Sequence, residues 1–461
     1  MAKCKTGLYR VRQVLAAREI DCGIPGYIDP NGKAVEVQVS PTFNENINMI
    51  ENNVARKTLT RTPNIPGLRS SNLAFTAWAK GSGTPAIEPA FGIYLEGCGF
   101  TPIALDLLTI SAGSGDFEVG ETVTGAPSGA TGIVRVKPKK GYNGELYVEP
   151  VTGAFAAADT ITGGTSGTTA TADAQTTAGF EYRPVSENFQ NLTIRSEEDS
   201  VICKEGNGML GTFTLTGDNS NPAAFEFTFD GRIGGYYRVS TDTPTIEPIA
   251  VNETLSWAGG TGTVVAAYNK TGGDPYLIYT LDSGVAIADT NAVTAAGGAS
   301  FNATSKSFDA VDTCAISDGV SFDPGQPPII QCAEFSANGF NPILQQFVLD
   351  MQNEVVVRED LNSCTGNQPA TITGRNPQLT FNPEVFDVAD WNVYDSWKNG
   401  ELVTGFDLWI GKQAGNRLFI QMDKIQIQQI ADGDRDGTAI FDITATVTSE
   451  TDDGEISIYF L

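Results

Sequence analysis

The sequence of 461 residues contains no histidine. Without imidazole, Ser-His-Asp and Cys-His nucleophile pairs, His-ligated zinc and imidazole acid–base catalysis are excluded. Positive charge is also scarce, because 29 Lys and Arg face 55 Asp and Glu, which gives a net charge of −26. Nucleic-acid recognition and polybasic membrane anchors need clustered cations, so the composition argues against both. We therefore expect a protein that is not an enzyme and holds no cofactor.

Long apolar runs are absent as well. No run approaches the roughly 18 residues that span a bilayer, and the first twenty residues lack the apolar core of a signal peptide. We expect a chain that is made in a cytoplasm and stays soluble. The cysteines are odd in number and lack a C-x-x-C pair, so we expect reduced, mostly buried thiols. They are Cys4, Cys22, Cys98, Cys203, Cys314, Cys332 and Cys364.

What is present is β-strand patterning. Runs such as 211–217, 224–229 and 440–447 alternate apolar and polar residues between Gly, Asp and Asn, which is typical of half-buried strands. Helical patterning is sparse, with candidates at 89–98 and 388–398. The second candidate carries Trp391, Tyr394 and Trp397 at three-residue spacing, an apolar stripe that predicts a helix packed on a sheet.

Two stretches of the chain repeat one another. Gly217-Asp218 and Phe225-Glu-Phe-Thr228 recur as Gly433-Asp434 and Phe441-Asp-Ile-Thr444, at an offset of 216. Upstream, Arg61-Thr-Pro63 matches Arg375-Asn-Pro377 at an offset of 314. We therefore predict one β fold used twice, with extra chain inserted in the first copy.

A second pair of repeats is rich in Gly and Thr. Glu121-Thr-Val123 and Ala158-Asp-Thr160 recur as Glu253-Thr-Leu255 and Ala288-Asp-Thr290, at offsets of 132 and 130. Chance matching of low-complexity sequence is the alternative to two small β modules. The predicted organisation is an N-terminal arm (1–30), a first core (31–107 and 180–248), an inserted module (108–179), a second module (249–312) and a second core (313–461).

The sharpest local motif is Asp432-Gly-Asp434-Arg-Asp436-Gly437, which resembles the first half of a calcium loop. Position twelve is Ile443 in place of a chelating glutamate. A plain strand–turn–strand connection is therefore the favoured interpretation, and Asp432, Asp434 and Asp436 are weak metal candidates. The basic cluster Lys137-Pro-Lys139-Lys140 fits a solvated hairpin tip better than a phosphate site.

Several runs resemble the tail tube proteins of long, flexible-tailed bacteriophages (siphophages). The first half of the resemblance lies in Arg56–Pro63, Ile65–Ser70, Leu73–Trp78, Gly81–Gly83 and Ala90–Phe100. The second half lies in Asn353–Arg358, Ile372–Pro377 and Asp434–Gly437. The doubled core is similar to the T5-type variant, in which a fused pair lets three chains close a pseudo-hexameric ring. The two modules depart from the simple pattern and resemble decoration domains on the tail exterior.

The resemblance implies a mainly β fold, with two tandem tail-tube-type β-sandwich or barrel cores, each with a flanking helix, and two small inserted β modules. It implies homotrimeric rings that stack into a tube in the virion tail, assembled in the host bacterial cytoplasm. The implied partners are other copies of the chain and the tail tip, terminator and tape measure proteins. DNA would pass during ejection without specific binding, and no membrane insertion is expected.

An acidic channel would repel phosphates and let DNA slide. Candidate lumen-lining hairpins lie at 44–60 and 347–363, although Arg56, Lys57 and Arg358 within them weaken this placement. A solvated outer surface is an equally good interpretation of any one of these acids. The candidate acidic residues are Glu45, Glu51, Glu354, Glu359 and Asp360.

Two other functions remain open from the sequence. A surface-displayed or capsid-decorating β adhesin would use the modules to bind glycans. A glycosidase would need only two carboxylates and no histidine, but nothing in the sequence selects a pair. The tail tube subunit is the leading hypothesis.

Overall fold

A computed structural model describes residues 12–19, 23–26, 28–29, 32–38, 41–136, 144–198, 202–219, 221–234, 236–242, 249–268, 275–304, 311–312, 317, 319–330, 333–363 and 365–461. The fold is mainly β, as predicted, with 57% of residues in strands and 3% in helices. No helix in these ranges is long and apolar enough to cross a membrane. The basic cluster at 137–140 lies outside them.

The two predicted cores share one order of strands. In the first repeat the antiparallel order is β1 (Arg12–Arg18), β10 (Leu192–Glu198), β11 (Ile202–Asp218), β12 (Ala224–Arg232), β3 (Ile65–Trp78) and β2 (Thr42–Ile50). In the second repeat it is β20 (Glu334–Ala337), β25 (Leu402–Ile410), β26 (Leu418–Arg435), β27 (Thr438–Thr448), β24 (Gln378–Pro383) and β21 (Leu344–Asp350). Each repeat therefore has the same six-strand topology.

Each repeat also carries one short helix at the same place in the chain. Helix α1 (Gly92–Gly97) follows β3, and α2 (Val393–Asn399) follows β24. The side chain of Asn392 caps α2 by accepting from the Asp395 N–H, and Gly400 ends it in the left-handed conformation. Helix α1 falls within the predicted range 89–98, and α2 overlaps the predicted range 388–398 and ends one residue beyond it.

Strands β11 and β21 pair with each other and join the repeats into one continuous sheet of eight strands. Its order is β2, β3, β12, β11, β21, β24, β27 and β26. A single apolar cluster lies beneath both repeats and includes Phe75, Phe227, Phe381 and Ile443. The final strand β28 (Ile456–Phe460) pairs with β26 and with the root of the first module.

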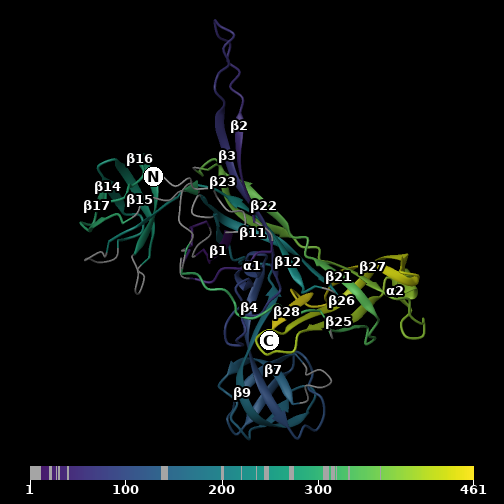
Figure 1. Cartoon of the computed structure of the whole chain (residues 1–461). Coiled ribbons are helices and arrows are strands. Elements are labelled where there is room, and N and C mark those ends of the chain that lie inside the picture. The colour runs from purple at the N-terminus through teal and green to yellow at the C-terminus, as the bar shows by residue number, and fades with distance from the viewer. Residues whose placement is uncertain are drawn as a thin grey trace, which may run out of the picture.

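The two small modules also share a topology. The first contains β5 (Thr122–Ala126), β6 (Thr131–Val136), β7 (Glu145–Thr152) and β8 (Thr160–Gly163), on a stalk of β4 (Phe100–Ser111) and β9 (Thr169–Pro184). The second contains β13 (Tyr237–Ser240), β14 (Thr254–Trp257), β15 (Gly260–Tyr268), β16 (Tyr276–Gly284), β17 (Ala292–Ala295) and β18 (Ser300–Asn302). Figure 1 shows them at the bottom and at the left of the molecule.

Matching pairings relate these modules strand by strand. The set β5–β6, β6–β7, β5–β8 and β8–β9 corresponds to β14–β15, β15–β16, β14–β17 and β17–β18. Glu121 accepts from the backbone N–H of Ser166, and Glu253 from that of Gly297, in equivalent turns. Each module has its own apolar cluster.

A long hairpin stands out from the sheet. Beyond the last residues that pair with β12, strands β2 and β3 continue together and end in an extended loop at 51–64, which reaches the top of Figure 1. We call residues 47–69 the arm. In the second repeat the chain between β21 and β24 instead forms a separate hairpin of β22 (Glu354–Glu359) and β23 (Asn367–Gly374). This hairpin packs against β11 and β12 of the first repeat.

The structure corrects the expected N-terminal arm. Residues 12–18 form β1, which pairs with β10, while the two-residue strand β19 (Val311–Asp312) pairs with β11. Val14 and Leu15 are buried, so this segment is held in the first repeat by apolar burial. Residues 1–11 lie outside the described ranges.

Two of the sequence alignments were shifted. Phe75 pairs with Phe227 and Phe381 pairs with Ile443, so β3 and β24 correspond at an offset of 381 − 75 = 306. The Arg-x-Pro motifs at an offset of 314 are therefore not equivalent, because the first lies in the loop of the arm. In the modules, Ala158 corresponds to Thr290, since both adopt positive φ in the same turn.

The expectation of reduced thiols was wrong for one cysteine. Cys203 is disulfide-bonded, whereas Cys98 is free and buried. The other five cysteines lie outside the described residues. The spacing of cysteines in the sequence could not indicate which of them meet in space.

Candidate functional site

One face of the eight-stranded sheet is polar and open to solvent. Side chains alternate along each strand, so the residues opposite the buried Phe, Leu and Ile positions all point to this face. Cross-strand pairing fixes the set. It comprises Thr42, Asn44, Asn72, Ala74, Thr76, Thr212, Thr214, Thr216, Glu226, Thr228, Asp230, Val348, Asp350, Gln378, Thr380, Gln426, Gln429, Asp442, Thr444 and Thr446.

The charges on this open face are mostly negative. The carboxylates at the positions named above are Glu226, Asp230, Asp350 and Asp442, and the remaining positions are mostly hydroxyl or amide side chains. Asp230 accepts from Asn72 at 2.8 Å, while Thr214 and Asp350 lie 3.4 Å apart across the junction of the repeats. Beyond these positions, the pairing of β26 with β27 also places Lys424 and Arg435 on this face, where they form ion pairs with Glu450 and Glu384.

The contact between the two repeats within the chain is itself an edge-to-edge strand pairing. Where the two repeats meet, residues 214–218 of β11 pair with 346–350 of β21. Flanking backbone bonds extend the joint, from Asn219 N to Gln345 O at 3.1 Å and from Met351 N to Phe213 O at 3.1 Å. The fifth strand of one repeat in chain order, β11, therefore binds the second strand of the next, β21.

The two outer strands of the eight-stranded sheet are the counterparts of the two strands in this joint: β26 corresponds to β11, and β2 corresponds to β21. At 429–435, β26 pairs with β27 on one side, and the described residues include no strand on the other. At the opposite end, β2 pairs only with β3 among the described strands. Arg12 and Lys204 donate to the backbone oxygens of Pro41 and Phe43 there, and long cations are a common protection for an exposed strand edge.

The acids predicted to line a channel lie elsewhere. Glu45 neighbours Asn44 and therefore points to the other side of β2. Glu51 is exposed in the arm and forms an ion pair with Arg61 at 3.0 Å. Glu354, Glu359 and Asp360 lie on the hairpin of β22 and β23, where the Asn362 backbone N–H lowers the pKa of Asp360. The structure brings Glu45 and Glu359 to the same pocket, between β2 and the β22–β23 hairpin, but it does not bring all five together.

The acids of the open face were missed, although the sequence contained their signal. Glu226 and Asp442 are the polar members of the alternating runs 224–229 and 440–447, and they are equivalent positions of the two repeats. Alternation alone indicates that they face away from the core. These strands were interpreted only as evidence for the fold and the repeat.

The weak metal candidates form a plain hairpin turn. Asp436 and Gly437 connect β26 to β27 with positive φ angles of 51° and 85°, the conformation of a tight two-residue turn. Asp434 accepts from the Gly437 N–H, and Asp432 accepts from the Tyr394 hydroxyl at 3.1 Å. In the part of the chain that the structure describes, no group of three His, Cys, Asp or Glu residues is arranged to hold a metal ion.

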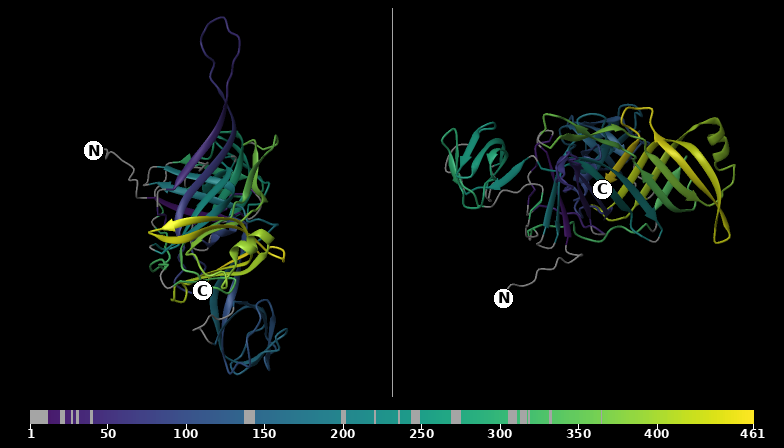
Figure 2. Two further views of the ribbon diagram at one scale, coloured as in Figure 1. Left: turned by 90° about the vertical axis from the view of Figure 1, so that its right-hand side faces the viewer. Right: turned by 90° about the horizontal axis from the view of Figure 1, so that it is seen from above.

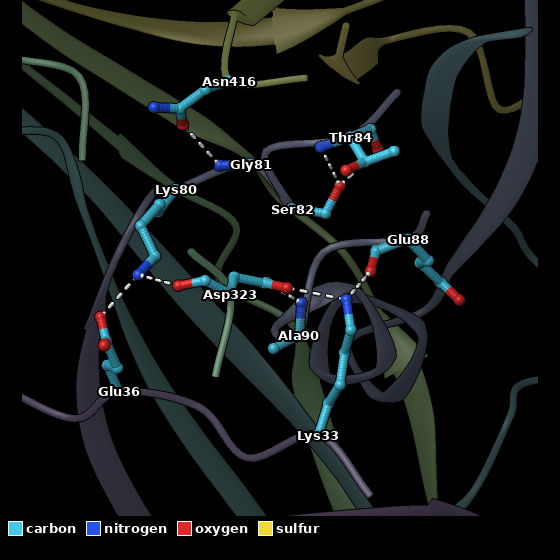
Figure 3. A network of polar contacts seen from close by, with 10 residues as sticks. All are labelled: Lys33, Glu36, Lys80, Gly81, Ser82, Thr84, Glu88, Ala90, Asp323 and Asn416. Atoms are coloured by element: carbon cyan, nitrogen blue, oxygen red, sulfur yellow. Dashed lines mark hydrogen bonds and ion pairs between the residues drawn. The ribbon is translucent and has the colours of Figure 1, made fainter. Parts of the chain in front are cut away.

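A polar cluster fixes the chain segment between the repeats onto the first repeat. Residues 319–330, which we call the strap, cross the first repeat before the second begins. Asp323 forms an ion pair with Lys33 at 2.7 Å and accepts from the Ala90 N–H at 2.6 Å, and its backbone oxygen accepts from Lys80 at 2.7 Å (Figure 3). Lys80 also pairs with Glu36. These contacts satisfy the cluster internally, which fits a structural lock better than a catalytic site.

The chain matches no family model and no curated protein to which it was compared.

Proposed function

We propose that this chain is a structural subunit of a bacteriophage tail tube. The observation that supports the proposal most strongly is the edge-to-edge joint between two equivalent repeats, with the same two kinds of edge left over at the ends of the sheet. A head-to-tail interface of this sort forms a closed ring when its rotation closes. The edge of β26 in one copy would bind β2 of the next, as β11 binds β21 within the chain.

The proposed ring contains three chains and therefore six repeats. The number follows from the resemblance to tail tube proteins, in which six units surround the channel. Closing the ring would also remove the last free edges of the sheet, which a single chain must otherwise protect. Stacked rings would form the tube, and the tail tip, terminator and tape measure proteins would be its partners in the virion tail.

The open face suits the wall of a DNA channel. It carries Glu226, Asp230, Asp350 and Asp442 among threonines, asparagines and glutamines. Its cations Lys424 and Arg435 are each paired with a carboxylate, Glu450 and Glu384. A wall with this excess of negative charge repels phosphate. DNA would therefore pass without being held, and no catalytic chemistry is required of the chain.

A proline in the free edge tests the joint. Arg435 and Thr438 flank the two-residue turn, so alternate backbone groups of β26 at Asp434 and Asp432 point away from β27. Asp432→Pro would remove an outward N–H while leaving the hairpin bonds intact. Electron microscopy and sedimentation of the wild type should show threefold rings or tubes. The variant should need at least about tenfold more protein to assemble.

The matched control is Asp432→Ala, which loses the same carboxylate and keeps the backbone N–H. It should assemble like the wild type, and all three proteins should melt within a few degrees of one another. A wild type that stays monomeric at every concentration, even with a tail initiation complex added, would rule out the tube subunit. Localisation on heads or fibres would favour the adhesin instead.

A further inference from the structure

The two equivalent helices differ sharply in burial. In α1, Gly92, Tyr94, Leu95, Glu96 and Gly97 are buried, whereas in α2 only Val393 and Ser396 are. Both helices follow the same strand of their repeat and lie on the same strand of the sheet, α1 on β11 and α2 on β26. Helix α1 is covered mostly by β1 and by the stalk strand β4, and its end also contacts the second repeat.

The end of α1 is covered by the hairpin of β22 and β23. Asn353, just before β22, donates to the backbone oxygens of Cys98 and Gly211 at 2.8 and 3.0 Å. Ile372 of β23 lies against Gly99, where a Cβ would meet its side chain at 3.0 Å. Thus the second repeat contacts the end of the first repeat's helix.

The end of α2 has no such cover among the described residues. Val385, Val388, Trp397 and Leu402 lie on and around it with exposed fractions of 47%, 60%, 38% and 44%. We call these four the α2 patch. Val385 lies beside Ala439 and Leu402 pairs with Gln426, so the patch runs along β26 on both sides of α2. Large apolar side chains exposed along one edge of a fold indicate a surface that is buried in an assembly.

The counterpart of the β22–β23 hairpin in the first repeat is the arm. The arm lies between β2 and β3, and the β22–β23 hairpin lies between the equivalent strands β21 and β24. The arm carries a set of exposed apolar side chains, with exposed fractions of 43% or more. They are Ile47, Met49, Ile50, Val54, Leu59 and Ile65.

The arm does not cover the α2 patch of its own chain. Strand β2 begins the eight-stranded sheet and β26 ends it, so the arm and α2 belong to opposite ends. Figure 2 shows the arm extending upward from the body of the molecule in the left-hand view, whereas the yellow-green helix α2 lies below the body's centre, above the first module. Only another copy can bring an arm to this patch.

We propose that the arm of one copy covers the α2 patch of the neighbouring copy, as the β22–β23 hairpin contacts the end of α1 within the chain. The inference rests on the proposed function, because the same joint that closes the ring places β2 of one copy beside β26 of the next. The second repeat of one chain and the first repeat of its neighbour would then repeat the contact already present inside each chain. Apolar burial at both surfaces would stabilise the ring.

Photo-cross-linking tests the contact directly. Val388→p-benzoylphenylalanine in assembled protein, made from a mixture of ¹⁴N and ¹⁵N copies, should give adducts between copies on peptides from residues 47–69. The matched control is Val251→p-benzoylphenylalanine on the second module, where the valine is 58% exposed, and it should not label the arm. Adducts from position 388 confined to its own chain, or to another region of the neighbour, would overturn the proposal.

Charge substitutions give a second readout. Leu402→Asp on the α2 patch and Ile50→Asp on the arm should each raise the concentration needed for assembly by about tenfold or more. The double variant should be less impaired than the two effects combined, since both disrupt one contact. Val251→Asp is the control and should assemble normally.

These results separate the two proposals. A wild type without rings overturns both. Rings that assemble normally in Leu402→Asp and Ile50→Asp overturn the arm contact alone and leave the tube subunit standing.

Discussion

The most unusual ionisable group in the described residues is Glu19. Its carboxylate accepts from the backbone N–H groups of Gly23 and Gly208 and from the Thr193 hydroxyl, at 2.7 to 3.0 Å. Burial nevertheless raises its pKa from 4.5 to about 7, and these hydrogen bonds and Arg232 only partly oppose the effect. The folded chain therefore binds this proton more tightly than the unfolded chain does.

The pKa of Glu19 predicts a pH dependence of stability. Between pH 4.5 and about 7 the folded state holds a proton that the unfolded state releases, so stability falls as pH rises through this window. The expected loss is about 3 kcal/mol. Urea unfolding at several pH values should show this slope in the wild type and lose it in Glu19→Gln. An unchanged slope in the variant would assign the effect to other groups.

At the scale of the element, the strap (residues 319–330) is held onto the first repeat by defined polar contacts. Its Asp323 side chain is 4% exposed and serves both the Lys33 ammonium and the Ala90 N–H. Ser321 adds backbone bonds with Gly32 and Ala34. The strap therefore fixes the segment between the repeats onto the first repeat.

Asp323→Ala should destabilise the chain by about 2–3 kcal/mol. The substitution leaves the Ala90 N–H without its acceptor and removes the ion pair of Lys33, while the backbone acceptor of Lys80 remains. Denaturant unfolding gives the measurement, and Asp452→Ala, at an exposed turn, is the control. If both variants lose the same stability, the strap does not act as a lock.

At the scale of the whole molecule, the open face predicts how the protein behaves toward DNA. With a net charge of −26 and four carboxylates on that face, the wild type should not bind duplex DNA at about 100 µM protein and 50 mM salt, where non-specific binders do. Lysine at Glu226, Asp230, Asp350 and Asp442 together should create binding whose affinity falls with salt, with a log–log slope of about −3 to −4.

Electrophoretic mobility and fluorescence anisotropy across a salt series provide the measurement. The control places four lysines at Asp116, Glu118, Asp282 and Asp289 of the modules, which changes the net charge equally and scatters it over two modules. It should bind DNA more weakly and with a shallower slope. Tight binding by the wild type near 50 mM salt would contradict the assignment of the open face.

The sequence by itself determined the mainly β fold, the two short helices and the two pairs of repeats. These features depend on local alternation, on helix patterning and on similarity between segments, which are all visible in the order of residues. The same alternation already pointed Glu226 and Asp442 away from the core.

Only the tertiary structure decided which acids share a face, that residues 12–18 join the first repeat, and that the β22–β23 hairpin contacts the end of α1. Each of these depends on which distant strands become neighbours, and strand pairing is set by the burial of both partners together. The junction of β11 with β21 is the clearest case, because no local pattern in either strand indicates that the two strands pair. That junction is also where the candidate assembly contact becomes visible.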